Sequence, residues 1–349
     1  MNKKALSNLF LLLLLPVFLL GGCSNSKANT SSSDPISKSE VLMGTFCTVK
    51  IYDSKDTKIL DKAFDRIKEI ENEVSINKEN TELDKVNANA GKEKVNVKND
   101  TYTIIKKGKE YSKLSSGTFD ITIGPIVKLW GIGTDSARLP SEDEIKERLP
   151  LINYEDLEID EKDHSIYLNK KGMVIDLGAI AKGYTADEIA KVLRENNVQS
   201  AIIDLGGNIY ALGNNSKGNP WKIGVQSPFL ERGETIGYVE EKDKSVVTSG
   251  IYERYFEQDG KRYHHILNPK DGYPYDNEIA GVTIVSDTSM DGDALSTTLF
   301  SLGVEKGLDF INKIPNVDAV FVTKDKDLYI TPGLKDIFKL TNKDFKMKN

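Results

Sequence analysis

The chain has 349 residues, of which 39% are hydrophobic and 29% are charged, so it is long enough to bury a sizeable core. Its 47 Lys and Arg residues are outnumbered by 53 Asp and Glu residues, which gives a formal net charge of −6. A dedicated nucleic-acid-binding protein is expected to have the opposite balance, concentrated in a basic patch. Composition therefore disfavours nucleic acid as a partner and leaves a globular protein of one large unit or two moderate domains.

Residues 1–22 are typical of a secretory signal peptide. Lys3 and Lys4 give a positive start, and the apolar run from Leu9 to Leu20 is too short and wrongly flanked for a membrane-spanning helix. The run ends in Leu-Gly-Gly-Cys, which resembles the bacterial lipobox, whose cysteine is lipidated after cleavage. We therefore expect Cys23 to hold the protein at the cell membrane, on its extracytoplasmic face. The alternative is a plain signal peptide followed by an unmodified cysteine.

Residues 23–38 are expected to form the lipidated cysteine and a flexible tether, since the stretch is rich in Ser, Asn, Thr and Lys and has no apolar periodicity. Residues 39–349 are then the catalytic domain. With Cys23 committed to lipid, Cys47 is the one remaining cysteine, so an intrachain disulfide is excluded. Without Lys3 and Lys4 the mature chain has 45 basic and 53 acidic residues, so we expect the lipid, and not charge, to hold it at an anionic membrane surface.

In chain order, Met43 to Tyr52 is expected to form a strand because of its Thr, Val, Ile and aromatic content. Apolar residues at three- and four-residue steps from Leu60 to Val74 predict an amphipathic helix, and a second helix is expected over Thr101 to Leu114. Val174 and Ile175 lead into a glycine-rich turn and a further helix. Later strands are expected at 201–204, 221–225, 245–248, 252–256, 282–285, 319–322 and 328–331, with a helix at 292–302. This order predicts an α+β fold with mixed, largely antiparallel sheets and packed helices, in one two-lobed catalytic unit.

The segment Asp293 to Thr297 places a carboxylate and a hydroxyl four residues apart on the last of these helices. Such side chains share one helix face and can bind one ion. Their oxygens suit a hard cation such as Mg²⁺, and the nearby helix N-terminus favours a phosphate. The alternative is the polar start of an ordinary helix.

The segment from Asp176 to Gly183 is a glycine-punctuated turn between a strand and a helix. Its small residues let a ligand approach the backbone, and Lys182 can meet a phosphate or a carbonyl group. The spacing matches neither a dinucleotide fingerprint nor a Walker loop. A purely structural turn is the alternative.

Two of the three histidines, His264 and His265, lie together before an Asn-Pro-Lys-Asp-Gly turn. A zinc site is disfavoured because no second His or Cys group lies at ligand spacing. Adjacent residues of a strand point to opposite faces, so one histidine can face a cleft while the other packs or meets solvent. A surface pair without function is the alternative.

The segment Gly117 to Pro125, with Leu129 to Gly131 after it, combines an aromatic residue, an acid and small residues. These residue types can line a pocket for a flat heterocycle. Core packing explains Phe119 and Trp130 equally well.

Five segments, taken together, resemble the ApbE-type FAD:protein FMN transferases in order and approximate spacing. They are Met43-Gly44-Thr45, Gly117 to Asp120 with Pro125 and Trp130, Asp176 to Tyr184, His265 to Pro269, and Asp293 to Thr297. Each motif is weak by itself, but the resemblance extends from about residue 40 to 335. It implies an α+β fold that binds FAD in a crevice and transfers FMN to a Ser or Thr hydroxyl of an acceptor protein, releasing AMP.

The resemblance also implies roles for individual residues. Asp293 and Thr297 would hold Mg²⁺ through their side chains and Ala179 through its carbonyl. His265 falls at the catalytic histidine, where a neutral imidazole can either take the hydroxyl proton or position the phosphate. Residues at FAD-contacting positions are Met43, Asn77, Thr118, Phe119, Asp120, Asp176, Lys182 and Ile266. The acceptors implied are electron-transfer proteins at the membrane or its outer face.

Asn77 departs from the family pattern, because many relatives have Tyr there. An Asn leaves more space and more water over the flavin, so hydrolysis of FAD to FMN and AMP is a second expected activity. A surface flavin-binding lipoprotein without catalysis is the non-enzymatic alternative, and the cation-binding set is what separates it from an enzyme.

Overall fold

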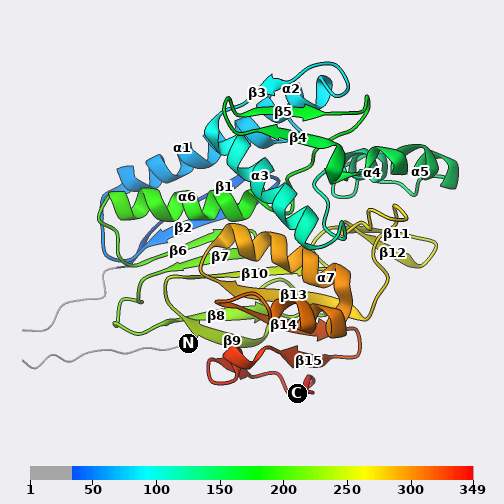
Figure 1. The fold of residues 1–349 in the computed structure, drawn as a ribbon. Helices are drawn as coiled ribbons and strands as arrows, with labels where there is room; N and C mark the ends of the chain where they lie inside the picture. The colour runs from blue at the N-terminus through cyan, green and yellow to red at the C-terminus, as the bar shows by residue number, and fades with distance from the viewer. Residues whose placement is uncertain (1–33, 349) are drawn as a thin grey trace, which may run out of the picture. The chain divides into compact units, whose positions relative to one another are not determined.

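A nine-stranded sheet is the centre of the computed structural model, which describes residues 34–348 (Figure 1). The predicted signal peptide and Cys23 lie outside the described residues. Neighbouring strands are antiparallel except for the last pair, β15 and β17. The order across the sheet is β1 (Ile36–Leu42), β2 (Thr45–Ile51), β6 (Ala201–Leu205), β7 (Asn208–Leu212), β10 (Lys244–Gly250), β13 (Ile279–Ser286), β14 (Val317–Thr323), β15 (Asp327–Ile330) and β17 (Lys346–Met347).

Three helices lie along one face of this sheet, with α6 between the other two (Figure 1). They are α1 (Thr57–Val74), α6 (Ala181–Glu195) and α7 (Ser289–Ile311). The apolar stripe of α1 packs with α6 on β2 and β6, where Phe64, Ile189 and Val49 are among the buried residues. Helix α7 lies on β10 and β13, and its backbone leaves helical geometry at Gly303, where φ is 78°.

The opposite face of the sheet is covered by a three-stranded antiparallel sheet. Its strands are β8 (Trp221–Gln226), β9 (Thr235–Glu241) and β16 (Phe338–Leu340), and a 3₁₀ turn, η3 (Pro332–Leu334), precedes β16. Apolar side chains of the two sheets, among them Val225, Val239, Val246 and Val320, form one buried cluster. Because the central strands are buried on both faces, they have continuous apolar runs, as in β13.

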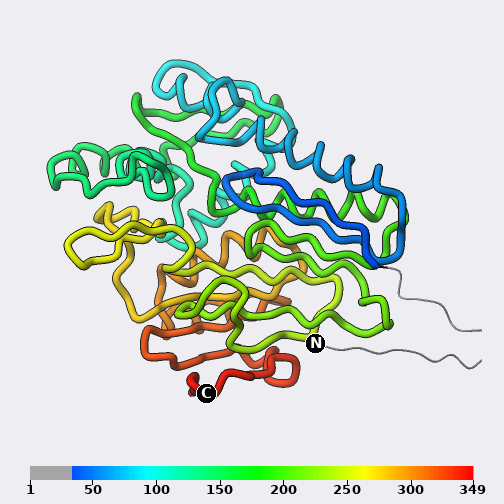
Figure 2. Tube along the Cα trace, turned by 180° about the vertical axis from the view of Figure 1, so that it is seen from behind, coloured from blue at the N-terminus to red at the C-terminus, as the bar shows by residue number. Residues whose placement is uncertain are grey.

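The remaining elements form a smaller α/β region and a hairpin. Helix α3 (Asn99–Leu114) connects this region to α1 and α7. The others are α2 (Glu82–Ala88), β3 (Val95–Asn96), α4 (Gly124–Trp130), α5 (Glu142–Arg148), η1 (Leu149–Leu151), η2 (Tyr154–Asp156), β4 (Leu157–Asp160), β5 (Ser165–Leu168), β11 (Tyr255–Gln258) and β12 (Lys261–His264). In the view from behind, the β11–β12 hairpin lies beside the α4–α5 segment (Figure 2).

The predicted α+β class with largely antiparallel sheets is confirmed, but three element boundaries are wrong. The strand expected from Met43 begins only at Thr45, because Met43 and Gly44 have φ values of 53° and 68° and form the turn between β1 and β2. The predicted tether ended at residue 38, yet β1 starts at Ile36. This edge strand alternates exposed and partly buried residues, so it has little apolar signal. Residues 252–254 are likewise a turn before β11. Within residues 34–348, none of the helices has the length and apolar character needed to cross a membrane.

Candidate active site

Helices α6 and α7 approach each other closely at Gly183, in the first turn of α6. A Cβ atom there would lie 2.3 Å from the carbonyl oxygen of Ser289 and 2.6 Å from the Cα atom of Met290, so only glycine permits this approach. The contact brings Asp293 of α7 to the start of α6. The Gly183 amide donates to Asp293 Oδ2 at 3.0 Å, and the Lys182 ammonium lies 3.1 and 3.3 Å from the two carboxylate oxygens.

The surroundings of Asp293 fit a hard cation. Its side chain is buried, and the ammonium that it binds also donates to the carbonyl of Gly178 at 3.1 Å, so a positive group already occupies a point between a carboxylate and a backbone oxygen. Thr297 lies one turn later on α7, and its partly exposed hydroxyl forms no hydrogen bond within residues 34–348. Ala179 follows Gly178 in the turn. No three His, Cys, Asp or Glu side chains gather into a metal-binding group in the described part of the chain, so the ligands on offer are a carboxylate, a hydroxyl and carbonyl oxygens.

The N-terminus of α7 does not offer the expected phosphate site. The helix starts at Ser289, a full turn before Asp293. The amides of Ser289 and Met290 donate to Asp187 of α6 at 2.7 and 2.9 Å, and the Thr288 hydroxyl caps the amide of Asp291. Because these first amides are already bonded, this part of the prediction is wrong.

His264 ends β12 and His265 follows it, and their side chains have different partners, as expected for adjacent residues of an extended chain. His264 is buried, with its Nε2 atom 3.0 Å from the carbonyl oxygen of Tyr275 and its ring against the ring of Phe300. His265 is half-buried, and its Nδ1 atom lies 3.2 Å from the carbonyl oxygen of Arg254. A carbonyl can only accept, so Nδ1 carries the proton and Nε2 keeps its lone pair.

His265 is neutral at physiological pH. Burial, together with the positive charge of Arg254, lowers its pKa to about 3. A neutral imidazole with a free Nε2 lone pair can accept a proton from a hydroxyl group.

The segment Thr118 to Asp120 follows α3, and most of it is interior. Phe119 is buried edge-on against Tyr111, and burial raises the pKa of Asp120. One oxygen of Asp120 accepts from the amide and hydroxyl of Thr122 at 2.8 and 2.7 Å, and the other from the amide of Tyr154 at 3.1 Å. Of these three residues, Thr118 is therefore the one that is partly exposed. Trp130 is buried too, with its Nε1 donating to the carbonyl of Gly272 at 2.7 Å, so the packing alternative holds for Trp130.

Backbone contacts join this segment to two others of the predicted set. The amide of Asp176 donates to the carbonyl of Ile121 at 2.8 Å, and the Asp176 side chain accepts from the amide of Gly178 at 2.7 Å. Burial raises the pKa of Asp176. On the other side, Tyr275 donates through its hydroxyl to the Thr118 carbonyl at 2.9 Å and through its amide to the carbonyl of the buried Ile266 at 3.0 Å.

Glu71, near the end of α1, connects Met43 to the segment of Asn77. Its Oε1 atom accepts from the Met43 amide at 2.7 Å, and its Oε2 atom accepts from the ammonium of Lys78 at 2.6 Å. Asn77, the residue before Lys78, is exposed. The structure thus places residues from the N-terminal hairpin and from the end of α1 next to each other.

Sequence reasoning missed Arg254. Its guanidinium donates to the carbonyl of Gly44 at 3.1 Å, and its own carbonyl accepts from the amide of His265 at 3.1 Å. The signal that could have found it is the Asp259-Gly260 turn, a typical hairpin dipeptide. With β11 and β12 paired across that turn, Tyr255 lies opposite His264, and Arg254 therefore lies beside His265.

A separate cavity of about 410 Å³ lies next to this region. It is lined by Pro125, Lys128, Leu129, Ser136, Arg138, Arg148, Gly172 and Val174. Pro125 and Leu129 come from a segment that was predicted to line a pocket, but none of the residues at the implied FAD-contacting, metal-binding or catalytic positions lines this cavity. Lys128, one of the lining residues, has a positive charge that opposes the rise in the pKa of Asp176.

An α+β fold with a buried carboxylate, a lysine and a neutral histidine defines a class of protein suited to transfer chemistry on phosphate esters. The family model described as the ApbE family matches residues 43–321. The chain is 42% identical over 295 residues to the FAD:protein FMN transferase of Klebsiella pneumoniae (strain 342), covering 84% of this chain and 91% of that protein. It is 35% identical over 317 residues to the FAD:protein FMN transferase of Treponema pallidum (strain Nichols), covering 86% and 88%. The chain therefore belongs to the ApbE family, as the sequence motifs predicted.

Solved structures agree with this assignment. The ApbE protein of Thermotoga maritima superposes with a TM-score of 0.79 at 31% identity, over 87% of this chain and 99% of that chain. The flavin transferase ApbE from Vibrio cholerae superposes with the same TM-score at 26% identity, again over 87% and 99%. The match extends over the α+β body in both comparisons.

Proposed function

We propose that this chain is a FAD:protein FMN transferase, which moves FMN from FAD onto a Ser or Thr hydroxyl of an acceptor protein and releases AMP. The observation that supports this most strongly is the match to transferases of this name over 84% of this chain and 91% of the relative. The candidate site supports it independently, because it offers the groups that the reaction needs.

The proposed reaction is a displacement at phosphorus. The acceptor hydroxyl oxygen attacks the phosphorus of the FMN half of FAD, and a new phosphoester bond forms. The bond between that phosphorus and the bridging oxygen breaks, and AMP leaves with the electron pair. His265 is proposed to take the hydroxyl proton at Nε2: the Nδ1 contact to the Arg254 carbonyl leaves Nε2 as the acceptor, and the lowered pKa keeps the ring neutral at physiological pH.

Asp293, Thr297 and the carbonyl of Ala179 are the groups proposed to hold Mg²⁺. Their oxygens are the ligand type that this ion prefers, and the Lys182 ammonium on Asp293 shows that the carboxylate stabilises a positive charge here. The chemistry that Mg²⁺ supplies when bound is neutralisation of the charge that builds on the pyrophosphate oxygens. Lys182, held between Asp293 and Gly178, can add its charge to the same region.

The FAD-binding surface is proposed to consist of segments that the fold brings together. Met43 and Asn77 come from the N-terminal part, Asp176 and Lys182 from the turn before α6, and Ile266 follows His265. Thr118, Phe119 and Asp120 complete the set. Since Phe119 and Asp120 are buried and Asp120 is fully hydrogen-bonded, we expect their contribution to be through the backbone.

The setting is proposed from the sequence. A lipidated Cys23 would anchor the enzyme to the extracytoplasmic face of the cell membrane. Acceptors would then be extracytoplasmic electron-transfer proteins with a Ser or Thr flavinylation site.

FAD pyrophosphatase activity is the second candidate. The observation that favours it is the exposed Asn77, which leaves the position without an aromatic cover. Water would then replace the acceptor hydroxyl in the same displacement.

The test is to incubate the chain from about residue 28 with FAD and Mg²⁺, with and without a Thr-containing acceptor domain. Intact-protein mass spectrometry and AMP release are read together, with Asp293→Ala as the control. An acceptor that gains the mass of an FMN phosphoester, only with metal and an intact Asp293, supports the transferase. AMP and free FMN without labelling support the pyrophosphatase, and bound FAD without turnover contradicts both enzymes.

A further inference from the structure

Arg254 is the cation of the site that has no carboxylate partner. Lys182 is held by Asp293, whereas Arg254 forms no ion pair with any of residues 34–348, although Glu253 is adjacent in sequence. In the described part of the chain, its guanidinium forms one hydrogen bond, to the neutral carbonyl of Gly44. A guanidinium has five N–H donors, so most of them are free to bind a ligand.

The position of this guanidinium follows from two fixed points. The backbone of Arg254 lies against His265, whose amide and Nδ1 both contact the Arg254 carbonyl at 3.1 and 3.2 Å. At the other end, the side chain reaches Gly44, the residue after Met43. Gly133 lies under the side chain, since a Cβ atom there would be 3.1 Å from Cδ of Arg254. The guanidinium therefore bridges the histidine and the hairpin turn.

The charge of Arg254 acts on the interior of the site. It lowers the pKa of His265, and it opposes the burial that raises the pKa values of Asp176 and Glu253. These groups come from three separate segments. Arg254 is the positive neighbour that they share, and it is exposed, so its free N–H groups are open to a ligand.

We propose that Arg254 is a substrate-binding residue whose guanidinium binds the pyrophosphate of FAD. This inference rests on the proposed function, in which FAD contacts Met43 and presents its phosphorus to a hydroxyl beside His265. A ligand that extends from Met43 to His265 lies along the guanidinium, because Arg254 bridges the same two points. The planar fork of N–H groups matches two phosphate oxygens, and phosphate is the anionic group of FAD.

The test compares FAD with riboflavin, which has the same ring system but no phosphate. Dissociation constants are measured by flavin fluorescence with Mg²⁺ for the wild type, Arg254→Gln and Arg254→Lys. We expect Arg254→Gln to weaken FAD about 10- to 100-fold and riboflavin less than about two-fold, with Arg254→Lys between the wild type and Gln. The matched control is Arg262→Gln on the same hairpin, because Arg262 pairs with Glu257 and stacks on Tyr255, and it should bind FAD as the wild type does.

Two results would overturn the proposal. Unchanged FAD affinity in Arg254→Gln would show that the guanidinium does not contact the pyrophosphate. Equal weakening of FAD and riboflavin would show that Arg254 only supports the hairpin turn at Gly44. Acceptor labelling by the wild type is measured in the same preparation: a wild type that binds FAD but labels no acceptor contradicts the proposed function and leaves the binding comparison decisive for Arg254.

Discussion

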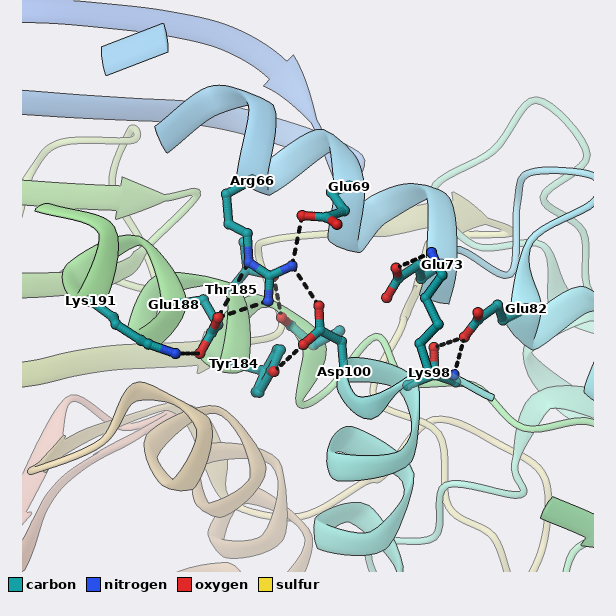
Figure 3. A network of polar contacts seen from close by, with 12 residues as sticks. Arg66, Glu69, Glu73, Glu82, Lys98, Asp100, Tyr184, Thr185, Glu188 and Lys191 are labelled. Carbon is teal, nitrogen blue, oxygen red and sulfur yellow. Dashed lines mark hydrogen bonds and ion pairs between the residues drawn. The ribbon is translucent and has the colours of Figure 1, made fainter. Parts of the chain in front are cut away.

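Two groups of polar and charged residues lie on two faces of helix α6. They differ in how many of their side chains have a hydrogen-bond or ion-pair partner. On the face toward α1 and α3, the Arg66 cluster consists of Arg66, Glu69, Asp100, Tyr184 and Glu188 (Figure 3). Arg66 contacts Asp100 at 2.6 Å, Glu188 at 2.7 Å and Glu69 at 2.9 Å, and the Tyr184 hydroxyl donates to Asp100 at 2.6 Å. The guanidinium thus has a carboxylate on every side.

On the face toward α7, Lys182 and Asp293 form a much smaller group. The Asp293 carboxylate is buried, but the ammonium of Lys182 is partly exposed and Thr297 nearby has an unused hydroxyl. We call a group closed when each of its charged side chains has a partner, and incomplete when some donors or acceptors are unused. The closed Arg66 cluster fixes three helices to one another, whereas an incomplete group leaves ligand positions for a cation and a phosphate. We therefore expect changes in closed groups to alter stability and changes in incomplete groups to alter activity.

The sharpest test of this division is Asp293→Asn. Removing the carboxylate charge removes the main ligand for a hard cation while keeping an oxygen for the Gly183 amide. We expect the rate of FMN transfer to fall roughly 1,000-fold or more. Single-turnover labelling of an acceptor with FAD and Mg²⁺ measures it. Transfer at the wild-type rate would show that Asp293 belongs with the structural groups.

His265→Ala tests a second incomplete group, the His265 imidazole, whose Nδ1 atom has a partner and whose Nε2 atom has none among the described residues. The free Nε2 atom is lost, and we expect transfer to fall about 100- to 1,000-fold while FAD affinity stays within a few-fold of the wild type. Flavin fluorescence gives the affinity and intact-protein mass spectrometry gives the transfer rate. If transfer is unchanged, His265 has no part in the mechanism.

Arg66→Met is the matched change in the closed cluster. It leaves the carboxylates of Asp100 and Glu188 without their common partner, in a region where Arg66 and both acids are mostly buried. We expect the free energy of unfolding to fall by about 2–4 kcal/mol, with the rate of FMN transfer at low temperature unchanged. Urea unfolding followed by circular dichroism measures the first, and the labelling assay the second. A large loss of transfer in a folded variant contradicts the division.

The histidine pair extends the comparison to pH. Burial lowers the pKa of His264 to about 4, so the unfolded chain, with an ordinary value near 6.5, takes up the proton first as the pH falls. The stability that the native state gains from keeping His264 neutral is complete above pH 6.5 and is lost as the pH falls toward 4. We expect about 2 kcal/mol of this loss between pH 6.5 and 5 to come from His264, and a shallower pH dependence in His264→Gln. Urea unfolding at a series of pH values measures both, and identical slopes would contradict the assignment.

The smallest expected effect is on the balance between transfer and hydrolysis. Asn77 is exposed at the end of the segment that follows α1, and Asn77→Tyr would place an aromatic ring where water has access. We expect the ratio of acceptor labelling to free FMN to rise several-fold with little change in stability. Chromatography of FMN and AMP alongside mass spectrometry gives the ratio. A ratio that stays at the wild-type value removes Asn77 from the control of hydrolysis.

Sequence patterns by themselves determined the fold class and the family, and they named the residues of the candidate site. Amphipathic spacing located α1, and short motifs named Asp293, His265 and the turn before α6, because helix periodicity and ligand-type side chains are local properties. Local patterns failed at the edge strand β1, whose alternating exposed residues have little apolar signal, and at Met43, whose positive φ depends on the turn that it forms with Gly44.

Only the tertiary structure decided how these parts work together. It showed that Gly183 lets α6 and α7 approach closely enough for Asp293 to meet Lys182, that Asp187 occupies the N-terminus of α7, and that Arg254 lies against His265. These contacts join residues that are distant in the sequence or turned by a hairpin. Distance, burial and the pKa of a buried group depend on what packs around it, and a linear pattern does not contain that information.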